Sequence, residues 1–175
     1  HGNLWLNDPD FLIVRGPNTA DISEDRYIVP HSRQHRPFHW LSGTAAKIDE
    51  VQVWASIILI SSGPLMLSDR LMKLNERGTE IINKVLKYHR TGTFAPLDLM
   101  ENPIPKILAR HCQDTQKNLE YDLIGFFNWY DEEQIIELPK IGLPKSAYDI
   151  WLDETVKLDK AIKLKPRSVR LLLLS

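Results

Sequence analysis

The first fifteen residues, HGNLWLNDPDFLIVR, constrain the fold of this chain more than any other stretch. They predict a polar turn at residues 5–10 that leads into a short apolar strand at residues 11–14. Pro9 fixes its own φ angle and biases the residue before it toward extended geometry, so the turn is stiff. Asp8 and Asp10 are two positions apart, and on an extended segment such side chains point to the same side. This pair suits acid/base or electrostatic work on a carbohydrate, but carboxylates in a turn also commonly accept backbone N–H groups.

The WLNDPD turn, followed by an apolar strand that ends in Arg15, resembles the signature of the melibiase-type alpha-galactosidases. These enzymes are retaining glycoside hydrolases built on a (β/α)8 barrel. The resemblance continues in the same order over nearly the whole chain. The later segments are Glu24-Asp25, LISSGPLMLSD at 59–69, FAPLDL at 94–99, FNW at 127–129 and PRSVRLL at 166–172.

The resemblance implies both a fold and a division of the chain. Residues 1–92 would be the end of the catalytic barrel, namely its last βα unit, because the signature belongs to the last barrel strand. Residues 93–175 would form a C-terminal antiparallel β-sandwich. The parent enzyme would hydrolyse terminal alpha-galactosyl linkages without a cofactor.

The resemblance also implies what this chain lacks. The nucleophilic and acid/base aspartates of the family lie upstream of the WLNDPD turn, and no segment here matches either motif. We therefore expect the chain alone to be inactive. Four residues are the candidates for lining the sugar pocket or supporting the residues that do: Trp5, Asn7, Asp8 and Asp10.

Length and composition support a globular fragment. The chain has 175 residues, whereas a full (β/α)8 barrel needs about 250. It begins at His1 rather than at an initiator Met, so we expect a fragment whose compartment the sequence leaves open. A single cysteine, Cys112, excludes an intrachain disulfide and a multi-thiol metal site.

Charge and hydropathy bear on the partners. Lys and Arg number 22 against 23 Asp and Glu, so no bulk field favours nucleic acid or an anionic membrane. The longest apolar run, residues 51–67, is interrupted by Gln52 and by Gly63-Pro64 and is shorter than the roughly 20 residues of a spanning helix. The expected partners are a galactoside in the parent enzyme and either the missing upstream barrel or a second copy of the chain.

A histidine cluster gives a competing hypothesis, a metal-binding protein. Its three members are spaced four apart: His31, His35 and His39. On one helix face they could ligate zinc. Pro37 argues against a continuous helix there, and two nearby arginines would repel a cation. The cluster is therefore a weak candidate, and a solvated or sugar-facing loop is the better interpretation.

The remaining pattern predicts helices followed by strands. Residues 16–43 predict mainly loop. One helix should begin near Thr44 and end at Gly63, and a second should follow Asn75 as its N-cap and end near His89. The proline-rich residues 93–105 predict a connection. Strands are expected at 106–112, 121–129, 134–137, 148–152, 161–165 and 168–174.

A further alternative is that residues 93–175 are a free-standing carbohydrate-binding or interaction module. The apolar face of the first helix is the feature that tests it. The helix carries a broad apolar face with Val51, Trp54, Ile58 and Leu59. Exposing such a face is unfavourable, so it should be covered by the β-sandwich, by the missing upstream barrel or by another copy. The first ninety residues could not bury their own apolar faces, which argues against a free-standing module.

Overall fold

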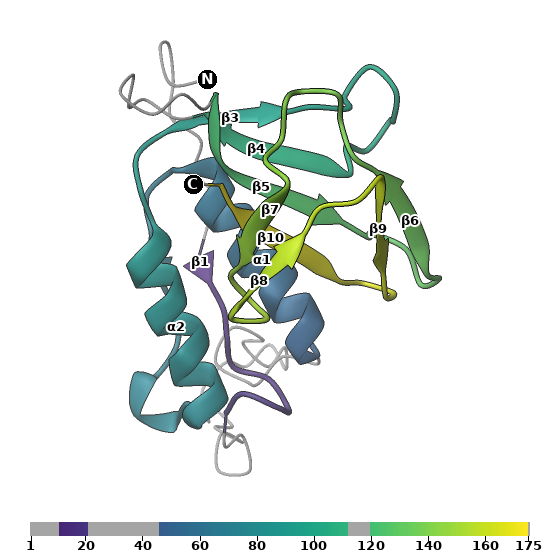
Figure 1. The fold of residues 1–175 in the computed structure, drawn as a ribbon. Coiled ribbons are helices and arrows are strands. Elements are labelled where there is room, and N and C mark those ends of the chain that lie inside the picture. The colour runs from purple at the N-terminus through teal and green to yellow at the C-terminus, as the bar shows by residue number, and fades with distance from the viewer. Residues whose placement is uncertain (1–10, 21–45, 112–119, 175) are drawn as a thin grey trace.

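A computed structural model describes residues 11–20, 46–111 and 120–174 (Figure 1). The helices are α1 (Ile48–Ser61) and α2 (Glu76–Tyr88), with a short 3-10 helix η1 (Leu71–Lys73). The strands are β1 (Phe11–Leu12), β2 (Met66–Leu67), β3 (Thr93–Pro96), β4 (Ile107–His111), β5 (Tyr121–Phe127), β6 (Gln134–Glu137), β7 (Ser146–Asp149), β8 (Glu154–Lys157), β9 (Ala161–Leu164) and β10 (Val169–Leu173).

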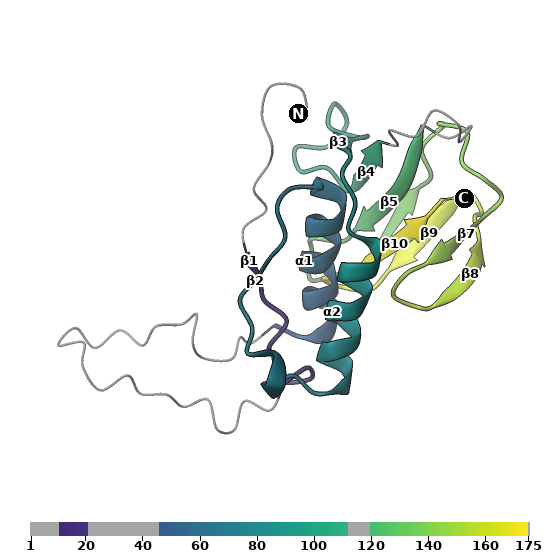
Figure 2. The same cartoon turned by 90° about the vertical axis from the view of Figure 1, so that its left-hand side faces the viewer.

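The elements form layers (Figure 2). β1 and β2 lie on one side of the two helices, and a six-stranded sheet of order β3-β4-β5-β10-β7-β8 lies on the other. Every neighbouring pair in that sheet is antiparallel. The antiparallel pair β6–β9 packs on the face of the sheet that is turned away from the helices.

Both faces of the central strands are buried, which explains their unbroken apolar sequences. Along β5, Leu123 and Phe127 belong to the core beneath the helices, whereas Ile124 and Phe126 belong to the core beneath β6–β9. All four side chains have no exposed surface. A strand covered on both faces shows no polar alternation. LIGFF in β5 and LLLL at residues 171–174 follow from this arrangement.

Helix α1 is confirmed, and its beginning and end have local causes. At its start the Glu50 carboxylate accepts the backbone N–H of Lys47 at 2.8 Å, and Asp49 and Glu50 both suit the positive end of the helix dipole. At its end Ser62 adopts a left-handed conformation with φ 57°, ahead of the Gly63-Pro64 pair. The helix begins at Ile48, a little later than predicted.

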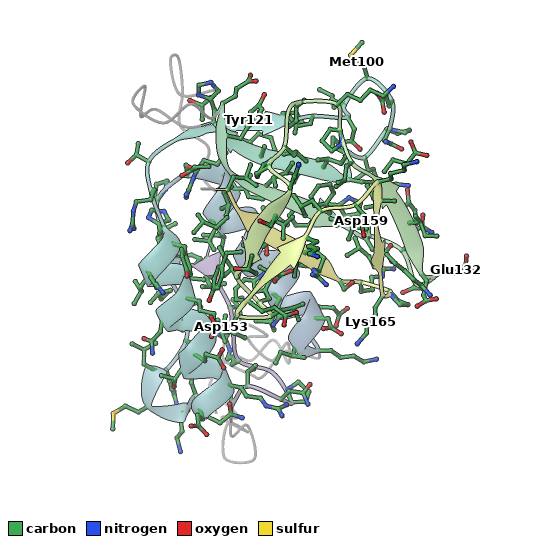
Figure 3. The ribbon with its side chains drawn as sticks, in the orientation of Figure 1. Met100, Tyr121, Glu132, Asp153, Asp159 and Lys165 are labelled. Atoms are coloured by element: carbon green, nitrogen blue, oxygen red, sulfur yellow. The ribbon has the colours of Figure 1, made fainter. Side chains whose placement is uncertain are left out.

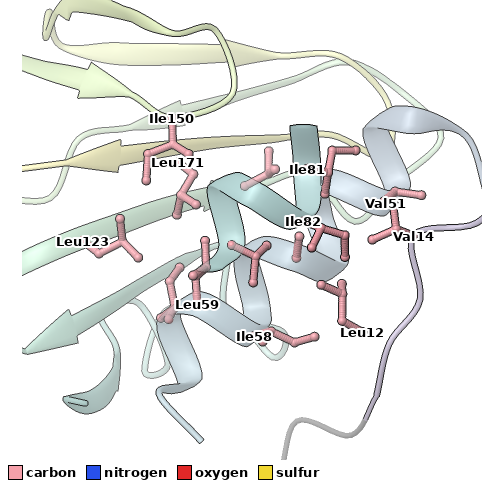
Figure 4. Close-up of a cluster of buried hydrophobic side chains, with 14 of the residues drawn as sticks. Leu12, Val14, Val51, Ile58, Leu59, Ile81, Ile82, Leu123, Ile150 and Leu171 are labelled. Carbon is pink, nitrogen blue, oxygen red and sulfur yellow. The ribbon is translucent and has the colours of Figure 1, made fainter. Parts of the chain in front are cut away.

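The apolar face of α1 is covered from within the chain. Val51, Ile58 and Leu59 have no exposed surface and form one core with α2, β1 and the sheet (Figure 4). Leu123 and Leu171 of the sheet belong to the same core. The helices and the antiparallel sheet therefore share one hydrophobic core.

Helix α2 follows its predicted cap. The Asn75 side chain accepts the backbone N–H of Gly78 at 3.1 Å, which satisfies one of the free donors of the first turn. Ile81, Ile82 and Val85 are buried at helical spacing. Lys84 pairs with Glu80 of the same helix at 2.8 Å, and its side chain is 12% exposed.

The parallel pair β1–β2 is a correction to the sequence prediction. The sequence predicted the end of a helix at Gly63 and, in the first ninety residues, a single strand at residues 11–14. Instead, Met66 and Leu67 pair in parallel with Phe11 and Leu12. The order is therefore β1–α1–β2–α2, with two parallel strands. A two-residue strand is too short to show a period in sequence.

The other two missed strands, β3 and β8, are the edges of the large sheet. β3 ends at Pro96, and proline is tolerated at a sheet edge because no ladder hydrogen bond is lost there. The prolines nearby led to the prediction of a connection. In β8 three of the four residues are exposed, so no hydrophobic pattern marks it.

Arg110 ties the helices to the sheet. Its guanidinium pairs with Asp122 through two hydrogen bonds, from Nε at 2.9 Å and from Nη2 at 2.8 Å. Nη1 donates to the carbonyls of Leu59 at 3.3 Å and Tyr88 at 3.0 Å. These carbonyls lie in the last turns of α1 and α2, where helices have no internal donors. A single arginine, 1% exposed, thus serves both helix ends.

A substitution of this arginine should be costly. Arg110→Lys keeps the charge but loses the planar fork, so Asp122 and one helix carbonyl lose donors in a buried site. We expect the free energy of unfolding to fall by about 2–4 kcal/mol in urea titrations. Arg167→Lys is the matched control, because Arg167 makes the same two-bond contact with Asp131 on the surface. Equal effects of the two substitutions would contradict the role of burial.

A second prediction concerns the contact between α1 and the sheet at Gly125. A Cβ atom there would lie 2.7 Å from Ile60 Cδ1 and 2.6 Å from Phe127 Cε2. Gly125→Ala should therefore lower the free energy of unfolding by about 1–3 kcal/mol. Ile60→Val removes the Cδ1 atom, so the double substitution should cost less than the sum of the two single ones. Strict additivity would show that the helix does not approach the sheet here.

Candidate functional site

The carboxyl ends of β1 and β2 are held together by one carboxylate. Asp69 follows β2, and its Oδ2 accepts the backbone N–H of Val14 at 2.7 Å. Its Oδ1 accepts the backbone N–H of Arg15 and the Arg15 Nη1, each at 3.1 Å. Arg15 Nη1 also donates to the Ser68 carbonyl at 3.0 Å. In parallel βα units this end of the sheet is where active-site loops gather.

The Arg15–Asp69 pair is buried, with side-chain exposures of 7% and 0%. Every oxygen of the carboxylate accepts a hydrogen bond from a backbone amide or from the guanidinium. A carboxylate whose oxygens are all engaged in this way has no acceptor left to face a substrate. The pair therefore locks the two strand ends in register, and it is not an acid/base group.

The chain after β1 is fastened to α2 by a second set of contacts. The Thr19 hydroxyl donates to the Val14 carbonyl, and the Thr19 carbonyl accepts the Asn75 backbone N–H at 3.0 Å. Asn75 Nδ2 donates to the Asn18 carbonyl at 3.0 Å. A Cβ atom on Gly78 would lie 2.2 Å from the Thr19 carbonyl oxygen, so this approach requires glycine.

Two of the sequence motifs prove to be loop anchors. In FAPLDL, the buried Asp98 carboxylate accepts the backbone N–H groups of Lys106 and Ile107 at 2.9 and 3.0 Å and the Asn102 amide at 2.9 Å. It thereby closes the β3–β4 loop. The FNW motif contains the buried Asn128.

Asn128 joins two turns. Its Nδ2 donates to the carbonyls of Glu132 and Lys165, each at 2.7 Å, and its Oδ1 accepts the Tyr130 backbone N–H at 3.0 Å. All the bonds of this amide are within the protein. The FNW motif therefore shapes the turns beside β5 and β10.

The buried carboxylates of the described residues are thus all engaged. Asp149 resembles the other two, since its Oδ1 accepts the backbone N–H groups of Trp151 and Leu152 at 2.9 and 3.0 Å. Together with Asp69 and Asp98 it supports backbone, and none of the three is placed as the nucleophile or acid of a retaining glycosidase. Within residues 11–20, 46–111 and 120–174, no group of three His, Cys, Asp or Glu side chains could hold a metal ion.

The residues predicted from the WLNDPD turn, Trp5, Asn7, Asp8 and Asp10, lie outside the described residues. The same holds for the histidines of the alternative metal site, His31, His35 and His39. The roles of both sets remain predictions. The contact at the strand ends that the sequence did not indicate is the Arg15–Asp69 pair. Its two members end separate motifs, 54 positions apart.

In the described part of the chain, neither helix is long and apolar enough to cross a membrane.

Comparison with known proteins identifies relatives of this fold. No family model matches the sequence, and no curated protein matches it either. Solved structures do match, and they are GH27 alpha-galactosidases and related enzymes. The resemblance to melibiase-type enzymes is therefore confirmed at the level of the fold: the chain has the fold of the C-terminal region of these proteins.

Three solved structures illustrate the match. A GH27 beta-L-arabinopyranosidase from Geobacillus stearothermophilus is 22% identical with a TM-score of 0.60, and the alignment covers 76% of this chain and 31% of that one. A Bacteroides fragilis protein assigned as an alpha-galactosidase/melibiase is 13% identical with a TM-score of 0.63, covering 97% and 34%. Alpha-galactosidase I from Mortierella vinacea is 14% identical with a TM-score of 0.52, covering 74% and 36%. The chain spans about a third of the length of these structures.

The lock between the strand ends can be tested by Asp69→Asn. The substitution removes a negative charge beside the buried Arg15 guanidinium and turns one acceptor oxygen into a donor that faces the Val14 N–H or Arg15. We expect the free energy of unfolding to fall by about 3–5 kcal/mol in denaturant titrations.

The control for this lock is Asp131→Asn. The Arg167 hydrogen bond lowers the pKa of Asp131, so Asp131 is ionised at neutral pH, and this pair lies on the surface. Its loss should leave the unfolding midpoint nearly unchanged. If Asp69→Asn were equally mild, the strand ends would have to be held by other contacts.

Proposed function

We propose that this chain is the C-terminal part of a retaining glycoside hydrolase that cleaves terminal alpha-galactosyl linkages. In this proposal residues 1–92 complete a (β/α)8 barrel and residues 93–175 form an antiparallel β-sandwich. The observation that carries it is the order of the elements. The parallel β1–α1–β2–α2 precedes an antiparallel sheet, and glycosidase structures share this fold.

The parallel β1–β2 pair supports a larger barrel. Parallel sheets occur almost only where helices cover them and where several strands lie side by side. Here the described sheet has two strands of two residues each, with α1 against it. Phe11 on its edge is 46% exposed. Further parallel strands from the parent enzyme would continue this sheet and cover that side chain.

The chemistry would be shared between this chain and the upstream part of the enzyme. Retaining glycosidases use two carboxyl groups about 5–5.5 Å apart, one as nucleophile and one as acid and then base. The buried carboxylates Asp69, Asp98 and Asp149 serve as backbone anchors, and in this proposal both catalytic groups would come from upstream strands. Trp5, Asn7, Asp8 and Asp10 would line the sugar pocket or support its lining, and Arg15 and Asp69 would hold the neighbouring strand ends in place.

The shared core argues against the alternative of a free-standing binding module. Leu123 and Leu171 of the sheet pack in one cluster with Ile58 of α1 and Leu12 of β1. Residues 93–175 on their own would expose this apolar face. A catalytic polypeptide in which sheet and barrel form one body accounts better for that packing.

The experiment compares this chain with the complete polypeptide of which it would be the C-terminal part. We expect the isolated chain not to hydrolyse an aryl alpha-D-galactoside and the complete polypeptide to do so. In the complete polypeptide, Asp8→Asn and Asp10→Asn should each lower kcat/KM by about tenfold or more, which corresponds to about 1.4 kcal/mol of transition-state binding. Asp131→Asn is the surface control.

Two results would contradict the proposal. Turnover by the isolated chain, abolished by Asp8→Asn or Asp10→Asn, would mean that the chain carries its own carboxylate pair. Absence of turnover by the complete polypeptide on both an aryl alpha-D-galactoside and an aryl beta-L-arabinopyranoside would remove the assigned activity. The second substrate has the ring stereochemistry of the first but lacks its hydroxymethyl group, so the ratio of the two rates measures the contacts to that group.

A further inference from the structure

We propose that a cleft between α1 and the antiparallel strands is a second carbohydrate site, which binds one neutral sugar unit. The cleft has a volume of about 290 Å³. It lies between the first turns of α1, the β7–β8 turn, the end of β9 and the beginning of β10. Figure 3 shows Lys165, one of its lining residues, beside the beginning of α1. This volume falls near the lower end of the range for small-molecule sites, which suits a single sugar ring.

Asp149 and Arg170 form a charge pair in the lining of the cleft. Asp149 has no exposed side-chain surface, and its Oδ2 lies 2.5 Å from Nε of Arg170. The two atoms are in contact but not aligned as a hydrogen bond, and neither has a hydrogen-bond partner among the described residues. Both atoms are closed to solvent and face each other, so this ion pair fixes the Arg170 side chain beside the cleft.

Arg170 lines the cleft with a side chain that can donate several hydrogen bonds. Its side chain is 29% exposed, and Asp149 holds the Nε side of the guanidinium. The outer nitrogens of an arginine held in this way form a fixed fork, which suits two neighbouring hydroxyl oxygens. Gln52 on α1 also lines the cleft and has both a donor and an acceptor in its amide.

The apolar wall of the cleft is rigid. Trp151 is fixed by a hydrogen bond from its Nε1 to Ser56 Oγ of α1 at 2.8 Å. Ile48 and Leu164 also line the cleft. At its rim Ser168 Oγ donates to the Lys165 carbonyl at 2.7 Å, which fixes the turn before β10. A sugar ring has apolar C–H faces and hydroxyl groups at its edge. The apolar and the polar side chains that line the cleft therefore match it.

The charges favour a neutral ligand over an anion. Asp149 compensates Arg170, and Glu133 pairs with Lys163 at 2.9 Å. Asp49 lines the cleft in the first turn of α1, where it opposes an anion at the positive end of the helix. A polyol can donate to Asp49 and accept from Arg170 without the desolvation cost of a full charge.

The cleft is separate from the site at the carboxyl ends of β1 and β2. Helix α1 lies between the β1–β2 pair and the six-stranded sheet (Figure 2), and the cleft opens on the sheet side of that helix. A sugar bound there would not reach the carboxyl ends of the parallel strands. It would hold a second unit of a branched or polymeric substrate. The choice of a sugar rests in part on the proposed function.

The test is a titration of the isotope-labelled chain with methyl alpha-D-galactopyranoside, followed by nitrogen–proton NMR. We expect saturable shifts of the Trp151 indole N–H and of the backbone amides of Gln52 and Ser168. Trp151→Phe identifies the indole signal. Inorganic phosphate is titrated in parallel as an anionic probe, and it should leave these signals in place.

Gln52→Ala is the main variant, because Gln52 lies at the cleft without an ion pair to disrupt. It should weaken binding by about fivefold, the effect of one hydrogen bond. Gln134→Ala on β6 is the matched control and should leave the affinity unchanged, since Gln134 does not line the cleft. Arg170→Lys should weaken binding more than Gln52→Ala, and its fold is checked in the same spectra.

Three outcomes would overturn the inference. They are the absence of saturable shifts at the cleft, equal loss of binding in the Gln52→Ala and Gln134→Ala variants, and a response to phosphate in place of the sugar. The result is independent of turnover. If the complete polypeptide hydrolyses alpha-galactosides while the cleft binds no sugar, the second site alone is refuted. If the cleft binds the sugar but the complete polypeptide shows no turnover, the proposed activity alone is refuted.

Discussion

The buried guanidinium of Arg110 is the interaction on which the arrangement of the two halves depends. It meets Asp122 on the neighbouring strand and the carbonyls of Leu59 and Tyr88 at the ends of α1 and α2. Helix termini have free carbonyls that must be satisfied when they are buried, and a charged donor with several N–H groups does this at one point. The hydrophobic effect between the helices and the sheet is non-directional. The hydrogen bonds of the arginine therefore fix the position of the helix ends relative to the sheet.

The same principle recurs wherever polar side chains are buried in this chain. Asp69, Asp98 and Asn128 each bind backbone groups that a loop would otherwise leave unpaired. Short polar side chains at strand ends and turns are suited to this work because they reach backbone amides two or more residues away. Residues that stand out in a sequence as a possible site can therefore be supports for loops. Among the described residues, Asp69, Asp98 and Asn128 are such supports.

Sequence reasoning succeeded where a long pattern marked an element. The strands at β4, β5, β6, β9 and β10 and both helices were predicted, and Asn75 caps α2 as expected. It failed at β2, β3 and β8. One is two residues long and the other two are sheet edges, where exposure removes the hydrophobic pattern and proline is tolerated. Of the site, the turn residues Trp5, Asn7, Asp8 and Asp10 were proposed from sequence, but the Arg15–Asp69 pair required the structure.

The sequence by itself determined the local conformation and indicated which known fold the chain resembles. Hydrophobic periods of 3.6 and 2 residues, helix caps and glycine–proline breaks depend on residues that are close together in the sequence. They can therefore be recognised from the sequence alone. Only the tertiary structure decided which partner each buried group has. Asp69 meets Arg15 across 54 positions, and Trp151 meets Ser56 across 95. Such pairings depend on how strands and helices stack, and no local pattern encodes that distance.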